Sequence, residues 1–173
     1  FMIGDVKQNG FNRLLGLLYV AAQVLGAMTG GLFCTILFAG HDRVVLSILP
    51  EKMLSGIVGE ALGAFLMVFM YLCSTEEKTK FTKDSVIQTM ILAASYLSAM
   101  KLSGANVEDF RLSPVNPAIA FAMNTTFFLG QKEGWRSIWI FLIFGFAGSL
   151  LSFLFFRFIY KTTAELAEEE EQA

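Results

Sequence analysis

Hydrophobic and polar positions alternate along this chain in long blocks. Four apolar blocks are each long enough to cross a bilayer, which takes about 20 residues in a helix. They cover residues 14–39, 54–73, 85–102 and 135–160. Short charged segments such as STEEKTKFTKD separate them. The pattern therefore predicts an all-α chain with four membrane-spanning helices in a single domain, residues 1–173.

A fifth apolar block is shorter and follows the sequence SPVNPAI at residues 113–119. Asn116 suits the N-cap of a helix, and Pro117 suits its first position, where the missing N–H costs nothing. A helix over residues 117–129 would be about 20 Å long, whereas the hydrocarbon core measures about 30 Å. We expect a re-entrant half-helix that starts near mid-membrane.

Irregular backbone at that depth is tolerated where protein buries it or where it lines a wet cavity. The residues before Asn116 are therefore expected to border a polar space. The half-helix would aim the positive end of its dipole at the membrane centre, where it repels cations.

Composition places the protein in the membrane. Hydrophobic residues make up 55% of the chain and charged residues 16%, against about 45–50% and 25% in soluble domains. The net charge of −2 gives no reason to expect nucleic acid as a partner. Two cysteines and one histidine show no metal-ligand spacing, and no paired carboxylates or nucleophile motif occur, so we predict no cofactor, no metal and no enzyme.

Glu60 is the acidic residue inside the second apolar block. A charged carboxylate near a bilayer centre costs about 2.5–3.5 kcal/mol on translocon scales. We expect Glu60 to face protein and accept hydrogen bonds from the re-entrant backbone, as a scaffold of that loop. The alternative is that it snorkels to the near membrane surface.

Several of these segments resemble the aquaporin and glycerol-channel family, the major intrinsic proteins. The segment YVAAQVLGAMTGG, with Gln23 and Gly26, is similar to the family's third helix, and GEALGAFLMVF, with Glu60, is similar to the fourth. Asn116-Pro117-Ala118 matches the second pore motif. The resemblance implies an aquaporin-like bundle of six spanning helices and two half-helices in inverted repeats, of which this chain holds four and one.

On this mapping the chain is the C-terminal two-thirds of the fold, and residues 1–8 are the end of the first half-helix. The N-terminal helices would lie in another part of the same polypeptide or in a separate chain. Residues 161–173 are expected to form an acidic soluble tail. Family members form tetramers, so a homotetramer or a place in a larger membrane assembly is expected.

The resemblance also implies which residues line the pore, namely Asn116, Pro117 and Ala118. The selectivity-filter positions align with Tyr96, Ser113 and Ile119, while Glu60 and Gln23 would support the pore loop. The family usually has Arg where Ile119 stands. Loss of the guanidinium makes the constriction more apolar, and apolar constrictions can close by dewetting.

Two functions remain open. The first is a multi-pass membrane channel for passive passage of water or small neutral solutes such as glycerol, with membrane lipid around it. The second is a non-conducting aquaporin-like subunit that serves a structural role in a larger membrane complex. The atypical filter favours the second, and the complete Asn-Pro-Ala motif is compatible with both.

Overall fold

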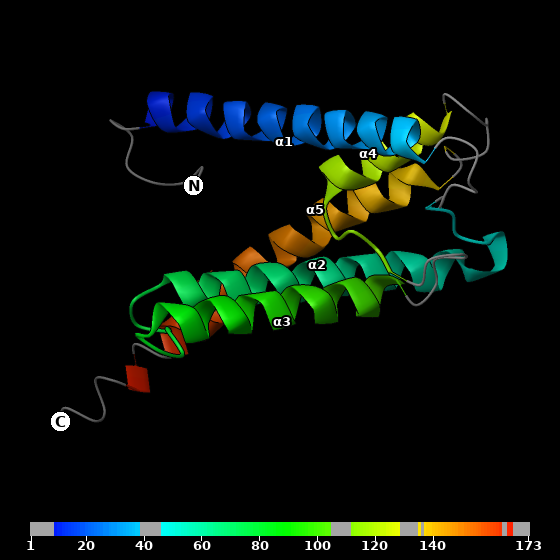
Figure 1. Cartoon of the computed structure of the whole chain (residues 1–173). Helices are drawn as coiled ribbons and strands as arrows, with labels where there is room; N and C mark the ends of the chain where they lie inside the picture. The colour runs from blue at the N-terminus through cyan, green and yellow to red at the C-terminus, as the bar shows by residue number, and fades with distance from the viewer. Residues whose placement is uncertain are drawn as a thin grey trace.

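The computed structural model describes residues 9–38, 46–104, 112–128, 135, 137–163 and 166–167. Its helices are α1 (Asn9–Leu37), α2 (Met53–Thr75), α3 (Ser85–Gly104), α4 (Pro117–Phe128) and α5 (Ile138–Phe155), with a 3₁₀ turn at Pro50–Lys52 and a π-helical turn at Phe156–Tyr160 (Figure 1). The expected end of a first half-helix, at residues 1–8, and most of the acidic tail lie outside the described residues.

Four described segments are long and apolar enough to cross a membrane, as predicted. They are Arg13–Leu37, Pro50–Thr75, Ser85–Gly104 and Ile138–Thr163. The half-length helix is also present, because α4 has 12 residues and so is about 18 Å long. The sequence prediction of an all-α membrane protein with a half-helix is therefore confirmed.

The last spanning helix begins at Ile138 rather than at Trp135, where the apolar block begins. Trp135 lies outside α5 and packs edge-on against Phe121 of α4, with the ring centroids 5.9 Å apart. Hydrophobicity alone could not show that Trp135 lies outside the helix. A tryptophan that packs between two helices is as apolar as one within a membrane span.

Helices α2, α3 and α5 pack together, with α2 in contact with both of the others (Figure 1). Glycines let their backbones approach closely. A Cβ on Gly63 of α2 would lie 2.9 Å from the Ala99 carbonyl oxygen of α3, and a Cβ on Gly148 of α5 would overlap the Ala61 carbonyl of α2. Such close approach is how helices associate in lipid, where packing replaces the hydrophobic effect.

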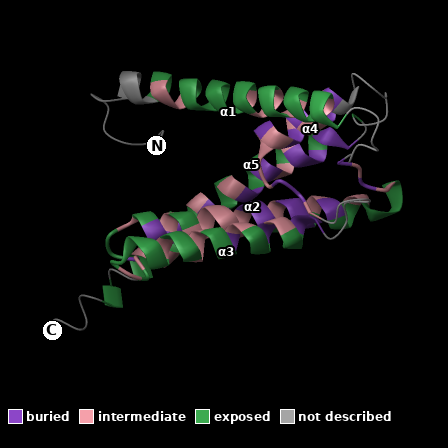
Figure 2. Cartoon of the chain, viewed as in Figure 1, coloured by how far each residue is buried: buried purple, intermediate pink, exposed green. Residues whose placement is uncertain are grey.

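The half-helix α4 packs against both α1 and α5 (Figure 1). Near the end of α1, a Cβ on Gly31 would lie 2.7 Å from Thr126 Cγ2 of α4. Most of the described side chains of α1 are exposed (Figure 2). A cluster of buried hydrophobic residues forms where α4 meets α5 and the segment before α2; it consists of Leu46, Ile48, Ala120, Ile140 and Phe141.

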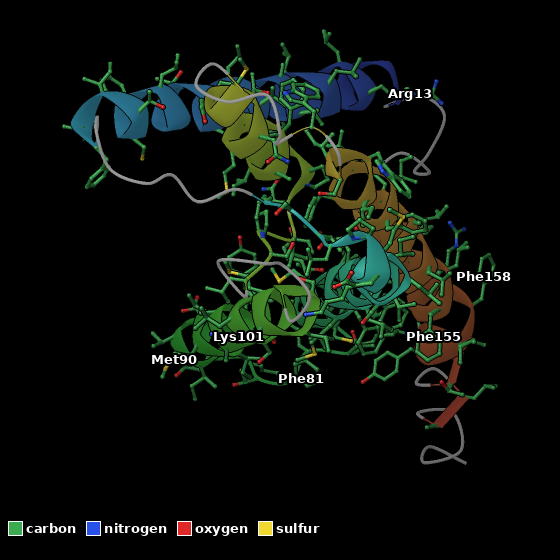
Figure 3. All side chains as sticks on the ribbon, turned by 90° about the vertical axis from the view of Figure 1, so that its right-hand side faces the viewer. Arg13, Phe81, Met90, Lys101, Phe155 and Phe158 are labelled. Atoms are coloured by element: carbon green, nitrogen blue, oxygen red, sulfur yellow. The ribbon has the colours of Figure 1, made fainter. Side chains whose placement is uncertain are left out.

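The far ends of α2 and α5 are joined by aromatic rings and one ion pair. Phe69 of α2 packs edge-on against Phe155 and Tyr160, with centroid distances of 5.7 and 5.2 Å. Lys161 Nζ lies 2.9 Å from Glu76 Oε1 just beyond these rings. Phe158, from the same π-helical turn, points outward and is exposed (Figure 3). These contacts hold the two helices together at the end opposite the half-helix.

Candidate pore-loop site

The half-helix begins at a side-chain cap. Asn116 Oδ1 accepts a hydrogen bond from the Ala118 N–H at 2.9 Å, and the Asn116 carbonyl accepts one from the Ala120 N–H at 3.0 Å. Pro117 occupies the first helical position, where no N–H is needed. The Asn-Pro-Ala sequence therefore starts α4 for local reasons, and it places the Asn116 side chain at the positive end of the helix dipole.

The segment before this cap is tied to the middle of α2. The Ser113 hydroxyl donates a hydrogen bond to Glu60 Oε2 at 2.6 Å, and both residues are buried, with 0% and 1% exposure. The Val115 N–H in turn donates to Ser113 Oγ at 3.4 Å. Glu60 thus faces protein rather than the membrane surface, but its donor is the Ser113 side chain and not the backbone that the sequence led us to expect.

Helix α5 also lies close to Glu60 and to the start of the half-helix. A Cβ built on Gly145 would make ordinary contacts, 3.5 Å from Pro117 Cγ and 4.0 Å from Glu60 Oε1. The Glu60 carboxylate therefore lies among three helices, close to the first residue of the half-helix. A hydrogen-bonded carboxylate in this surrounding suits a structural role.

Two hydrogen bonds join helix α3 to the segment that precedes Asn116. The Tyr96 hydroxyl donates a hydrogen bond to the Pro114 carbonyl at 3.0 Å, and the Ser113 N–H donates to the Met100 carbonyl at 3.1 Å. A Cβ on Gly104 at the end of α3 would overlap the Leu112 backbone. Backbone polar groups at membrane depth need such partners, because lipid offers none.

Val115 connects this anchored segment to the cap, and its φ is +49°. A β-branched residue in the left-handed region is a conformational outlier. Such conformations persist only where the surrounding contacts determine them, and they occur often at functional sites.

The structure brings together most of the residues singled out in the sequence. Glu60, Tyr96, Ser113 and the Asn116-Pro117 pair form one hydrogen-bonded or packed group. Ala118 is buried in the first turn of α4.

Two further predicted site residues lie apart from this hydrogen-bonded group. Ile119 is half-buried in the first turn of α4. Gln23 is exposed on α1, and no hydrogen bond joins it to this group within the part of the chain that the structure describes.

Some features were not visible in the sequence. The Pro114 and Met100 carbonyls act through the backbone, so no residue type marks them. Asn124 of α4 is fully buried, and neither its amide nitrogen nor its oxygen has a hydrogen-bond partner. Its place on an apolar half-helix predicts this burial, whereas the missing hydrogen-bond partners could not be predicted from the sequence.

Among the residues that the structure describes, no group of three or more His, Cys, Asp or Glu side chains could hold a metal ion. Cys34 is exposed and Cys73 is buried, and both are free thiols. His41 lies outside the described residues.

Comparison with known proteins gives one family. The profile of the major intrinsic protein family matches residues 3–156. The chain is 23% identical over 156 residues to the probable aquaporin PIP2-8 of Oryza sativa subsp. japonica; the match covers 87% of this chain and 55% of that protein. The chain thus spans about half the length of this relative, and no solved structure matches it significantly. Because the family match covers most of the chain, including α2 to α5, this protein belongs to the major intrinsic protein family.

Proposed function

We infer that the full-length protein is a passive membrane channel for water or small neutral solutes. The observation that carries this proposal is the half-helix α4, which begins at Asn116-Pro117 and is anchored through Ser113 to the buried Glu60. Family membership and the aquaporin relative support the same reading. The protein is an integral, multi-pass membrane protein, and no cofactor enters the proposal.

Permeation would depend on the N-terminal end of α4, where Asn116 lies. Asn116 uses its side-chain oxygen to cap the helix, which leaves its NH₂ group to donate to a passing water or hydroxyl. The positive end of the helix dipole lies at the same place and raises the energy of a cation there. Asn116, Pro117 and Ala118 are therefore the proposed pore-lining residues.

The outer constriction is proposed at Tyr96, Ser113 and Ile119. Ile119 would give this constriction an apolar wall and favour neutral over charged solutes. Ser113 has no exposed surface, so its contribution would be made through its bond to Glu60. We also propose that Gln23, together with Glu60, supports the pore loop.

Transport would follow the osmotic or solute gradient without chemical conversion. The family assignment fits the expectation that the protein is not an enzyme, because major intrinsic proteins are channels. Large apolar side chains are exposed on every spanning helix. Lipid and neighbouring subunits, in a homotetramer or a larger membrane assembly, are the partners proposed for these surfaces.

Osmotic shrinkage of proteoliposomes, followed by stopped flow, tests the proposal. Full-length protein should raise water permeability well above that of empty liposomes. Asn116→Asp should remove most of the increase, because it loses the NH₂ donors and adds a charge at the half-helix. Lys83→Asp places a carboxylate on an exposed loop residue instead and should leave permeability unchanged. Repeating the measurement in glycerol identifies the solute.

A second candidate function is a structural subunit that does not conduct. The observation that favours it is Ile119, which gives the first turn of the half-helix an apolar side chain where the family usually has arginine. Permeability equal to that of empty liposomes, from folded and correctly oriented protein, would favour this role and contradict the channel.

A further inference from the structure

The peptide between Pro114 and Val115 has an unusual conformation and a specific partner. Val115 has a φ of +49°, and the carbonyl of the preceding residue, Pro114, accepts the Tyr96 hydroxyl at 3.0 Å. L-residues avoid positive φ because the Cβ then crowds the backbone, and β-branched residues avoid it most. A strained peptide needs contacts that hold it.

The N–H of this peptide, that of Val115, donates a hydrogen bond to Ser113 Oγ that is long, at 3.4 Å, and the other neighbouring restraints act on either side of the peptide. Ser113 is fixed before it by the Met100 carbonyl and by Glu60. Asn116 is fixed after it by its cap on α4. Tyr96 binds the Pro114 carbonyl itself, which turns with the Pro114–Val115 peptide plane. If that plane rotated, Val115 could return to negative φ, and the carbonyl would leave the tyrosine.

We propose that Tyr96 is a positioning residue whose hydroxyl holds the Pro114–Val115 peptide in its strained orientation and thereby sets where the Asn116 amide lies. Tyr96 is half-buried on α3, and the peptide lies directly before the half-helix, so one hydrogen bond couples a spanning helix to the cap. The consequence for permeation rests on the proposed channel function. The hydrogen bond and the strain do not depend on it.

The first experiment measures the hydrogen bond directly. Full-length protein labelled with ¹³C at the proline carbonyls is compared with Tyr96→Phe by infrared difference spectroscopy, in which unchanged prolines cancel. Loss of the hydroxyl should move one labelled carbonyl band to higher frequency. Tyr71→Phe, on an exposed position of α2, is the matched control and should give no band. Absence of a shift in Tyr96→Phe would overturn the proposal.

The second experiment tests positioning by rescue. Tyr96→Phe should lower the population of the strained peptide orientation by the factor that one hydrogen bond supplies, roughly threefold to tenfold. Water permeability should fall by the same factor, and Tm should fall as well. Val115→Gly should restore both in the double variant, because glycine adopts positive φ without strain. Val115→Gly alone should behave like the wild type.

The outcomes separate the two proposals. If Val115→Gly fails to rescue Tm in the Tyr96→Phe background, Tyr96 does not act through the strained peptide, and the positioning role is wrong. If the wild type shows no permeability, the channel function fails, while the infrared band and the Tm rescue still decide the role of Tyr96.

Discussion

Ser113 and Glu60 are 53 positions apart in the chain, yet the serine hydroxyl donates a 2.6 Å hydrogen bond to the carboxylate. Both side chains are buried between the re-entrant segment and helix α2. The bond satisfies a polar group on each side and fixes the distance between a spanning helix and the start of the half-helix.

Removing the acceptor should therefore destabilise the fold. Glu60→Leu leaves the buried Ser113 hydroxyl without its partner, which costs about 1–3 kcal/mol, and should lower the Tm of the detergent-solubilised protein. Glu60→Gln keeps an oxygen acceptor of similar size and should cost much less. Equal losses in the two variants would show that the hydrogen bond does not stabilise the loop.

The close contact between α2 and α5 depends on Gly148, which has no side chain to separate the two helices. Gly148→Ala would place a methyl group onto the Ala61 carbonyl and force the helices apart. We expect a loss of about 1–3 kcal/mol, as for other overpacked interiors, measured by thermal unfolding. Gly145→Ala on the same helix meets only ordinary contacts and is the control. A harmless Gly148→Ala would contradict this packing.

The apolar side chain of Ile119, in the first turn of the half-helix, should limit the size of the solutes that pass. If Ile119 narrows the proposed constriction, Ile119→Ala should raise glycerol permeability severalfold relative to water in the proteoliposome assay. Ile143→Ala removes the same atoms from an exposed position of α5 and should change neither permeability. An unchanged glycerol-to-water ratio in Ile119→Ala would place the constriction elsewhere.

The loop between α2 and α3 carries a pH-dependent ion pair. The hydrogen bond that Lys80 donates, together with its charge, holds the pKa of Glu77 below its usual value of 4.5. Since folding lowers this pKa, the pair adds stability above the unfolded-chain pKa and loses it as pH falls through the folded value. The gain is small because exposed charges are screened.

Lys80→Met should therefore lower Tm slightly at neutral pH and not at all once Glu77 is protonated in both proteins. The Glu77→Gln background removes the titrating group and should abolish this pH dependence. A Tm difference between Lys80→Met and wild type that stayed constant into acid would show that Lys80 acts through another contact.

The sequence by itself determined the helices. The lengths of its apolar blocks predicted four spans, and Asn116-Pro117 predicted the start of a half-helix; the structure has both. These features are local, since span length and helix capping depend on residues that are neighbours in the chain. The desolvation cost of a carboxylate also indicated from sequence alone that Glu60 would face protein.

Only the tertiary structure decided what these elements touch. Ser113 as the partner of Glu60, the Pro114 carbonyl as the partner of Tyr96, and the place of Gly148 against Ala61 all depend on how the helices rotate and cross. Spanning helices are apolar on most sides, so their hydrophobic pattern does not specify which face meets which neighbour. The positive φ of Val115 has the same origin, because contacts from three surrounding elements hold a conformation that valine by itself avoids.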